Sequence, residues 1–226
     1  MKKEKESVDK FAYERALFSE GAKYVAGVDE VGRGPLAGPV VCAAVIMPAD
    51  ENLMIDGVDD SKKLSAKKRE ALDLLIRERA LAYSIFEVSE KEIDEINILQ
   101  ATRKGMREAL LSLKITPDAV LTDGNMTLDI PFPQRSVIHG DALSYSIGAA
   151  SIIAKVYRDA LMDKLAEIYP AYGFEKNKGY GTAAHIAAIR EVGACPVHRR
   201  TFIKKFWAGR AKKPWRNIFA PSGMKF

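Results

Sequence analysis

Two short apolar runs near the start of the chain are separated by a turn that is rich in glycine and proline. The runs are "KYVAGVDEV" (residues 23–31) and "GPVVCAAVIMP" (residues 38–48), and the turn extends from Gly32 to Pro35. Valine-rich runs that are bounded by Gly and Pro are typical of β-strands. The pattern therefore predicts a hairpin of two strands.

Two helices are predicted in the next part of the chain, on either side of a further strand. Ser65 is placed to cap the first helix, after which apolar residues recur at the spacing of one helix face. The strand is "YSIFEVS" (residues 83–89). Ser89 and Glu92 then have the spacing of a capping box, which predicts a second helix over residues 90–113.

The second half of the chain contains one more strand and the longest helical pattern. The segment "PDAVLTDGN" (residues 117–125) predicts a short buried strand that ends on Asp123, before a Gly-Asn turn. Residues 139–170 predict one long helix whose first half is small and apolar, and Asp141 stands at the position of an N-cap.

A final helix is predicted after residue 181. Thr182 is placed to cap this helix, which runs to about Val192, and the segment "CPVHRRTF" (residues 195–202) ends it. Strands and helices alternate through one domain that is followed by a basic tail. This order predicts the α/β fold class.

Length and composition narrow the class of protein. A chain of 226 residues with 47% hydrophobic content is long enough for one substantial core. Its two cysteines, Cys42 and Cys195, are far apart, which indicates neither a disulfide framework nor a four-ligand zinc site. The charged N-terminus does not resemble a signal peptide, and no run of about 18 apolar residues occurs. We therefore expect a cytoplasmic protein that does not span a membrane.

Positive charge is concentrated at the C-terminal end. No acidic residue follows Glu191, whereas residues 192–226 contain nine Lys or Arg together with both tryptophans. Basic residues interleaved with aromatic residues suit contact with phosphates and stacked bases. A basic tail that is docked on the protein by its aromatic residues is an equal alternative.

Four acidic residues have unusual placements. Asp29, Glu30 and Asp123 lie at the ends of predicted buried strands, and Asp141 lies where a helix is predicted to begin. An ionised carboxylate beside an apolar core is costly unless it is paired or bound to a cation. No His or Cys stands among the four, and all-oxygen ligands favour hard cations, so the implied metal is Mg²⁺ or Mn²⁺.

A purely structural explanation of these acids also has to be weighed. An Asp before Gly-Asn, as at position 123, is commonly a turn residue, and an Asp at a helix start is commonly a cap. The pair Asp29 and Glu30 is harder to explain in this way, because it closes an apolar run and has no turn to stabilise. Composition and spacing therefore leave a metal-dependent hydrolase and a purely structural role both open.

Helix length excludes one further acid. Asp159 follows Asp141 by 18 residues on the same predicted helix. At about 1.5 Å per residue, the two carboxylates would be roughly 27 Å apart. Asp159 is therefore not expected to share a metal with Asp141.

A set of motifs in a fixed order closely resembles bacterial ribonuclease HII, over about residues 24–203. The resemblance implies a ribonuclease H-like fold with a mixed central sheet flanked by helices and a C-terminal helical, basic extension. It divides the chain into an N-terminal extension (1–23), a catalytic domain (24–203) and a tail (204–226). The motifs are "VDEVGRGPLAGPVVCAAV", "DDSKKLS", "EIDEINILQAT", "LTDGN", "GDALSYSIGAASIIAKVYRD", "YPAYGFEKNKGYGT" and "PVHRRTF".

The resemblance implies an endonuclease that hydrolyses the RNA strand of RNA–DNA hybrids and cuts beside single ribonucleotides in duplex DNA. The family's catalytic and metal-binding acids correspond to Asp29, Glu30, Asp123 and Asp141. Two divalent ions, Mg²⁺ or Mn²⁺, would lie about 3.5–4 Å apart. Because neighbouring side chains on a strand point to opposite faces, we expect Asp29 to bridge the ions and Glu30 to contribute from the strand end, through its carbonyl.

The resemblance also implies substrate-binding residues. The family's Gly-Arg-Gly turn corresponds to Gly32, Arg33 and Gly34. The main chain of the two glycines would approach the 2′-hydroxyl, and Arg33 would be a phosphate or packing contact. The family's sugar-stacking tyrosine corresponds to Tyr180, although Tyr169 and Tyr172 lie nearby in the sequence.

Other substrate contacts stay open. Lys62, Lys63 and Asn97 are candidate phosphate contacts on loops, with solvated surface as an equal alternative. His139 and Leu143 replace two lysines that the family often has around Asp141, which puts local phosphate contacts in doubt.

The expected partners are RNA–DNA hybrid and ribonucleotide-containing duplex DNA, bound by a monomer. One alternative function is a ribonuclease HIII-like enzyme or another metal nuclease of the same fold, and ribonuclease HIII usually lacks the Gly-Arg-Gly turn. The other alternative is a nucleic-acid binding module without activity.

Overall fold

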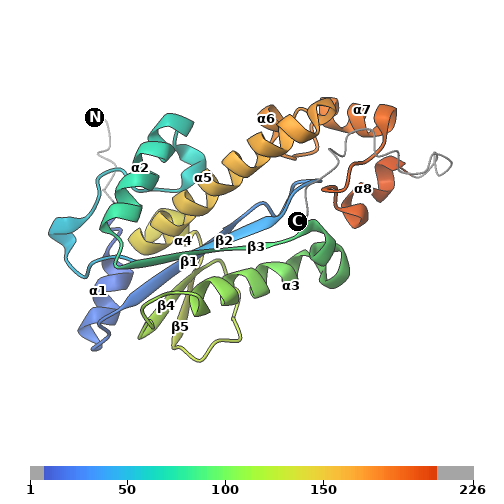
Figure 1. Ribbon diagram of the computed structural model, residues 1–226. Helices are drawn as coiled ribbons and strands as arrows, with labels where there is room; N and C mark the ends of the chain where they lie inside the picture. The colour runs from blue at the N-terminus through green and yellow to red at the C-terminus, as the bar shows by residue number, and fades with distance from the viewer. Residues whose placement is uncertain (1–7, 208–226) are drawn as a thin grey trace, which may run out of the picture.

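One mixed sheet of five strands organises residues 8–207, the part of the chain that the computed structural model describes. The order of the strands across the sheet is β3-β2-β1-β4-β5 (Figure 1). β1 is antiparallel to β2 and β2 to β3, whereas β4 runs parallel to β1 and β5 to β4. The mixed sheet and the α/β class predicted from the sequence are confirmed. The strands are β1 (Val25–Val31), β2 (Val40–Ile46), β3 (Ala82–Val88), β4 (Ala119–Asp123) and β5 (Gln134–Val137).

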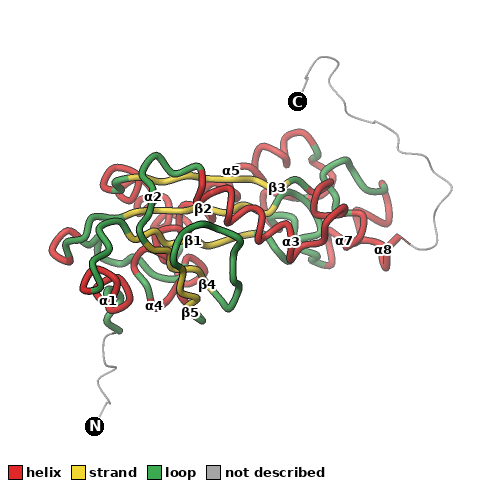
Figure 2. Tube along the Cα trace, turned by 90° about the horizontal axis from the view of Figure 1, so that it is seen from below, coloured by secondary structure: helices red, strands yellow, loops and turns green. Residues whose placement is uncertain are grey.

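Helices cover both faces of the sheet. α2 and α5 pack on one face, and α3 packs on the other (Figure 1). α1 lies at one end of the molecule, and α6, α7 and α8 lie together at the opposite end (Figures 1 and 2). None of the helices within residues 8–207 is long and apolar enough to cross a membrane. The helices are α1 (Ala12–Ser19), α2 (Ala66–Arg79), α3 (Glu90–Leu111), α4 (Gly140–Leu143), α5 (Tyr145–Ile168), α6 (Phe174–Asn177), α7 (Ala183–Val192) and α8 (Arg200–Trp207), with short 3₁₀ helices at Glu51–Leu53, Ser61–Lys63 and Pro170–Tyr172.

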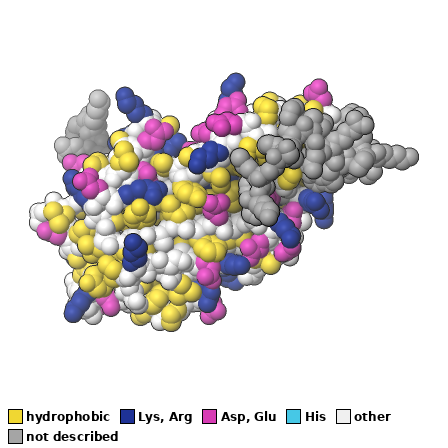
Figure 3. Space-filling view, in the orientation of Figure 1, with side chains coloured by type: hydrophobic (Ala, Val, Ile, Leu, Met, Phe, Trp, Pro, Cys, Tyr) yellow, Lys and Arg dark blue, Asp and Glu magenta, His cyan; other side chains and the backbone are white. Residues whose placement is uncertain are grey.

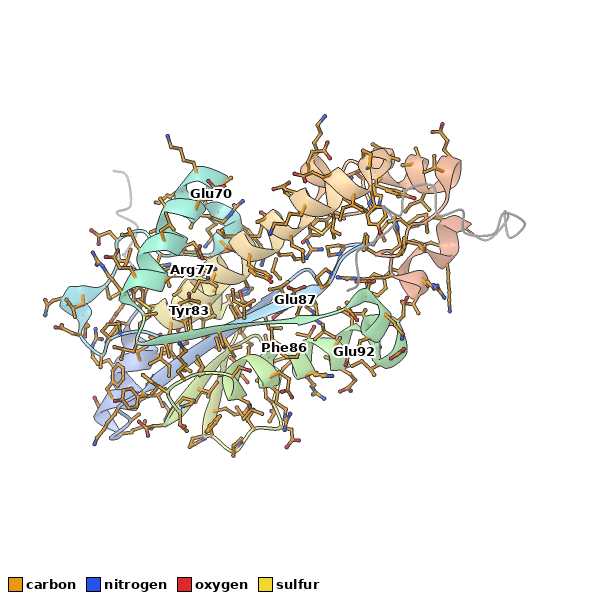
Figure 4. All side chains as sticks on the ribbon, in the orientation of Figure 1. Glu70, Arg77, Tyr83, Phe86, Glu87 and Glu92 are labelled. Atoms are coloured by element: carbon orange, nitrogen blue, oxygen red, sulfur yellow. The ribbon has the colours of Figure 1, made fainter. Side chains whose placement is uncertain are left out.

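The predicted hairpin is formed by β1 and β2. All seven residues of β2 are buried, because helices cover both faces of the sheet at this central strand. On the edge strand β3, side chains alternate between the two faces of the sheet (Figure 4). Tyr83 contacts Arg77 of α2, and Glu87 accepts a hydrogen bond from Tyr157 of α5, whereas Phe86 packs on the α3 side.

Three predicted helix caps are present. The side-chain oxygens of Ser65, Ser89 and Thr182 each accept a hydrogen bond from the backbone amide three residues later. Each bond satisfies an amide that has no partner within its own helix.

The prediction of one long helix over residues 139–170 is wrong. Ser144 has extended backbone angles, which separate the short α4 from α5, and Asp141 lies in the first turn of α4 instead of at a cap. A buried carboxylate from α1 stabilises this break. Glu14 accepts hydrogen bonds from the hydroxyl of Ser144 (2.6 Å) and from the amide and hydroxyl of Ser146 (2.9 and 2.6 Å).

Two elements differ from the sequence expectation at the ends of the core. β5 was not predicted, because its sequence "QRSV" is mostly polar and half-exposed. α8 begins at Arg200, inside the segment that was expected to end the last helix.

α1 and the residue before it pack on the core through Leu17 and Phe11. The division of the chain at residues 23 and 204 stays a prediction. Most of the predicted tail, residues 208–226, lies outside the described residues.

β1 and α5 approach each other so closely that only glycine fits between them. A methyl group on Gly27 would lie 2.2 Å from the backbone carbon of Ser146 and 2.4 Å from the backbone nitrogen of Ile147. Neither backbone atom can move without shifting α5 as a whole. This contact therefore fixes the distance between the helix and the strand that carries two of the acids.

We predict that Gly27→Ala lowers the free energy of unfolding by about 3 kcal/mol, because overpacking against backbone cannot be relieved by a rotamer change. Urea denaturation measures the loss. Gly34→Ala is the matched control, because the nearest atom to its added methyl group, on Tyr180, is 3.6 Å away. If the two variants are equally stable, the close approach of β1 and α5 is incorrect.

Candidate metal-binding active site

Three carboxylates converge where β1 and β4 end. The parallel pairing aligns Val28 of β1 with Thr122 of β4, so that the next residues, Asp29 and Asp123, lie side by side. One carboxylate oxygen each from Asp29, Glu30 and Asp123 lies within 4.8 Å of the others. These distances suit a shared cation.

Glu30 reaches this cluster with its side chain. The alternation of side chains along a regular strand predicted a contribution from its carbonyl instead. β1 ends one residue later, at Val31, and the amide of Glu30 donates a 2.7 Å hydrogen bond to the carboxylate of Asp29. The geometry therefore favours the carboxylate of Glu30 as the ligand.

The fourth acid lies beside the cluster. Asp141 is in the first turn of α4, and its amide and that of Gly140 point to the same oxygen of Asp123, at 3.4 and 2.7 Å. Asp141 is not within the 4.8 Å group of three carboxylates. The start of α4 thus orients Asp123 and brings Asp141 next to it.

Burial and neighbouring carboxylates raise the pKa of Asp29, Glu30 and Asp141. Burial and the charges of Glu30 and Asp123 raise the pKa of Asp29 well above its ordinary value. Burial also raises the pKa of Glu30, where Arg33 partly offsets the effect, and burial and the charge of Asp123 raise the pKa of Asp141. Like charges held together in a buried place are destabilising unless a cation lies among them. The all-oxygen donor set fits a hard divalent cation.

Two exposed cations border the acids. Nη1 of Arg33 lies 3.3 Å from a carboxylate oxygen of Glu30, and Nζ of Lys62 lies 3.6 Å from a carboxylate oxygen of Asp141. The side chain of Lys62 is 76% exposed. Lys62 lies on the 3₁₀ helix Ser61–Lys63 and not on a loop as expected, and its exposed ammonium can contact solvent or a ligand without rearrangement of the core.

The loop that follows β1 contacts the segment that carries Tyr180. The position of a methyl group on Gly34 is 3.6 Å from Cε1 of Tyr180, and the amide of Leu36 donates to the carbonyl of Gly179 (2.8 Å). Tyr180 is 44% exposed, whereas Tyr172 is buried and donates to the carbonyl of Gly193. Of these two tyrosines, only Tyr180 is available to a ligand.

Two of the candidate phosphate contacts lie elsewhere than expected. Asn97 is not on a loop, since it lies within α3 at a kink with φ of 68°, where its Oδ1 accepts bonds from the amides of Leu99 and Gln100. Lys63 forms an ion pair with Asp59 (3.6 Å). Asn97 falls within the helix predicted over residues 90–113, and Lys63 lies on the 3₁₀ helix Ser61–Lys63 and not on a loop.

The remaining sequence candidates also have defined places. His139 is exposed, and Leu143 packs beside α1 and α5. Asp159 forms ion pairs with Arg69 (3.4 Å) and Lys155 (2.7 Å) on α5, which accounts for its charge.

The comparisons with known proteins agree with one another. A family model described as ribonuclease HII matches residues 26–208. A ribonuclease HII from Ruminiclostridium cellulolyticum is 53% identical over 195 residues, which cover 86% of this chain and 76% of that protein. The crystal structure of ribonuclease H2 from Pyrococcus horikoshii is similar with a TM-score of 0.71 at 30% identity, covering 84% of this chain and all of the other. Bst-RNase HIII in complex with Mn²⁺ is similar in fold, with a TM-score of 0.61 at 20% identity, covering 79% of this chain and 65% of that one.

We predict that Asp29→Asn stabilises the metal-free protein at pH about 8, because burial and the neighbouring carboxylates disfavour the charged form of Asp29. The substitution removes one repelling charge, and the amide oxygen can still accept the bond from Glu30. The raised pKa of Asp29 sets the sign of the pH dependence. As the pH falls, wild-type Asp29 takes up a proton and the repulsion disappears, so the advantage of the variant shrinks.

Urea denaturation in the presence of a chelator, repeated at several pH values, measures this difference. Asp159→Asn is the matched control, because it removes a carboxylate that is paired with two cations and should lower stability. A loss of stability in Asp29→Asn at every pH would show that the acids do not repel one another.

Proposed function

The chain belongs to the ribonuclease HII family, whose activity is cleavage of the RNA strand of RNA–DNA hybrids, and we propose that it also cuts on the 5′ side of single ribonucleotides in duplex DNA. The observation that carries the proposal is the cluster of Asp29, Glu30 and Asp123 at the end of β1 and β4. This acid cluster is flanked by the loop of Gly32, Arg33 and Gly34. The products would be a 3′-hydroxyl and a 5′-phosphate.

Four carboxylates would hold two divalent ions, Mg²⁺ or Mn²⁺. Bound there, such ions supply an activated water and stabilise the leaving 3′ oxygen of an in-line displacement. Asp29 and Asp123 are held for this purpose by main-chain amides, those of Glu30 and Gly140. Because these amides are part of β1 and α4, the ligands are oriented before any ion binds.

Positive side chains around the acids would contact the substrate backbone. Lys62 is exposed and already lies beside Asp141, so its ammonium can reach a phosphate oxygen near the cluster. Lys63 and Asn97, whose charge and side-chain oxygen have other partners, are weaker candidates.

Discrimination between ribose and deoxyribose would come from the loop of Gly32 to Gly34. The 2′-hydroxyl is the group that distinguishes the two sugars at a single nucleotide, and glycines allow main-chain groups to approach it closely. The exposed ring of Tyr180 lies against Gly34, where it would stack on the next sugar and disfavour a second 2′-hydroxyl.

Two alternatives have distinct consequences. A ribonuclease HIII-like or other nuclease of the same fold would cut without preference for the DNA junction of a single ribonucleotide. A binding module without activity would gain nothing from a buried acid cluster, whose mutual repulsion destabilises the protein when no metal is bound. The acid cluster therefore argues against the binding module.

The wider setting follows from the substrate. Ribonucleotides in duplex DNA are removed during DNA repair and replication, so we place the protein in these processes, as a cytoplasmic monomer. The ribonucleotide-containing duplex is the partner that the exposed loop and acid cluster fit.

We predict that Asp123→Asn lowers the rate of cleavage of a duplex with one ribonucleotide at least about a hundredfold, because it removes a carboxylate charge that would hold the divalent ions. Affinity for the duplex should be retained. Single-turnover cleavage in Mg²⁺ or Mn²⁺, with products mapped to the nucleotide, measures the loss.

The control for this variant is Asp159→Asn, the same chemical change on α5 outside the acid cluster, which should retain cleavage. Wild-type turnover in Asp123→Asn would overturn its assignment. Cleavage of an all-DNA duplex, or failure to cut 5′ to the single ribonucleotide, would favour another nuclease of the same fold.

The positive charge of the C-terminal segment provides a separate test. Residues 208–226 contain five Lys or Arg and no acid, whereas on the face seen in Figure 3 positive and negative side chains of the described residues are interspersed. We predict that removal of residues 208–226 weakens duplex binding and reduces the slope of log K against log salt by about 0.9 for each phosphate that the segment neutralises.

Fluorescence anisotropy across a salt series measures this slope. A full-length variant with the five basic residues replaced by Gln separates charge from stacking by the aromatic residues. An unchanged slope in both variants would leave the segment without a role in DNA binding.

A further inference from the structure

Two arginines are fully buried and have no carboxylate partner within residues 8–207. Arg158 of α5 and Arg199, just before α8, both have no exposed surface. Neither forms a salt bridge with any residue that the structure describes. Burial and the charge of Arg158 lower the pKa of Arg199 to about 9, which still leaves it protonated at neutral pH. Burial of an unpaired cation is costly, so the contacts of these guanidinium groups must compensate for that cost.

The guanidinium of Arg199 binds the carbonyls of the loop after β1. Its Nη2 donates to Gly32 (2.5 Å) and to Gly38 (2.8 Å), and its Nη1 donates to Arg33 (2.9 Å). Its Nε donates a second bond to Gly38 (3.0 Å), and its own amide donates to Leu36 (2.8 Å). A planar fork with five donors suits this arrangement, and a lysine ammonium does not reproduce it.

Arg158 binds the next part of the same loop. Its guanidinium donates to the carbonyls of Pro39 (3.0 Å) and Ala37 (3.1 Å), and also to that of Lys178 (2.9 Å), close to Tyr180. Gly32 has a φ of +92°, and a methyl group there would lie 2.2 Å from Nε of Arg158. A side chain at position 32 would therefore collide with the guanidinium of Arg158.

The planar peptide bond fixes the direction in which the amides of Arg33 and Gly34 point. The carbonyl of Gly32 and the N–H of Arg33 belong to one trans peptide and point in opposite directions, as do the carbonyl of Arg33 and the N–H of Gly34. Since Arg199 holds both carbonyls inward, both N–H groups face outward. Within residues 8–207 neither N–H has an intramolecular acceptor.

We propose that Arg199 is a positioning residue for ribonucleotide recognition, which holds the carbonyls of Gly32 and Arg33 inward so that the amides of Arg33 and Gly34 face the 2′-hydroxyl of the substrate. This inference rests on the proposed function, and it names the residue that sets the specificity of that site. Arg199 touches neither substrate nor metal, because it has no exposed surface.

His198, the residue before Arg199, is linked by hydrogen bonds to the backbone of Tyr180, the proposed sugar-stacking residue. The amide of Cys195 donates to Nδ1 of His198 (3.0 Å), so the proton of His198 is on Nε2 and is donated to Nε2 of His185 (3.0 Å). The proton of His185 is then on Nδ1 and is donated to the carbonyl of Tyr180 (2.9 Å). Burial lowers the pKa of both histidines, to about 3 for His198, which keeps them neutral and this chain of bonds intact.

Binding of two duplexes that differ by one 2′-hydroxyl tests the proposal without catalysis. The duplexes have the same sequence, one all-DNA and one with a single ribonucleotide, and fluorescence anisotropy in Ca²⁺ measures both dissociation constants. Wild type should prefer the ribonucleotide duplex. Arg199→Lys should reduce that preference by about fivefold, the effect of removing one hydrogen bond of typical strength. Affinity for the all-DNA duplex should stay within about twofold, because phosphate contacts supply it.

Two controls separate positioning from stability and charge. Arg200→Lys is the same change at the next residue, which is exposed, and should retain the preference. Leu110→Ala, in the core beside Ala26 and Val120, lowers stability without touching the loop and should also retain it. If Arg199→Lys does not fold, Arg199→Gln, which buries no charge, replaces it in the same assay.

The outcomes distinguish the inference from the proposed function. A wild-type protein that binds the two duplexes equally would overturn the proposed discrimination itself. A folded Arg199 variant that retains the wild-type preference would overturn the inference alone. An equal loss of affinity for both duplexes would also overturn the inference, because it indicates a general structural role.

Discussion

The parallel pairing of β1 with β4 is the constraint on which the acid cluster depends. It aligns Asp29 and Asp123 at the C-terminal ends of two inner strands. Neighbouring strands lie about 4.8 Å apart. Carboxylates at this spacing reach one cation without any loop to position them. β1 is paired with β2 on its other side and lies against the backbone of α5 at Gly27, so this end of β1 cannot move independently of the core.

The same pairing imposes an electrostatic cost. The amides of Glu30 and Gly140 and the exposed side chains of Arg33 and Lys62 offset part of the repulsion among the acids. They do not neutralise it, since the pKa values of Asp29, Glu30 and Asp141 are still raised. A site that is unfavourable when empty and favourable when it holds cations is one that stability alone would not select.

Local patterns account for what could be predicted from the sequence. The caps at Ser65, Ser89 and Thr182 depend on contacts within three residues, and the hairpin of β1 and β2 depends on the short turn between two neighbouring runs. The acids at strand ends stand out because their charge conflicts with the apolar run before them. That they lie close together depends on the order of the strands, which the resemblance to a known family implied.

Distant contacts account for what could not be predicted. The break at Ser144 involves Glu14, 130 residues away in the chain. The kink at Asn97 is not of this kind, because Asn97 itself has a φ of 68° inside a helical pattern. In the sequence, Arg158 falls within a long predicted helix and Arg199 is one of the nine basic residues after Glu191. Nothing near them in the sequence shows that both bind carbonyls more than 100 residues away.

The helix α5 contacts both β1, which carries two of the acids, and the loop that follows β1. The first half of this helix lies against β1 at Gly27, and its second half carries Arg158, which binds the loop after β1. The helix has 24 residues and is therefore about 36 Å long. A tilt of such a helix displaces both of its ends, so a change that moves the acids of β1 also moves the loop of Gly32 to Gly34. The spacing between the acid cluster and the loop of Gly32 to Gly34 is thus a property of α5 and β1 together, and variation in the exposed loop alone cannot retune it.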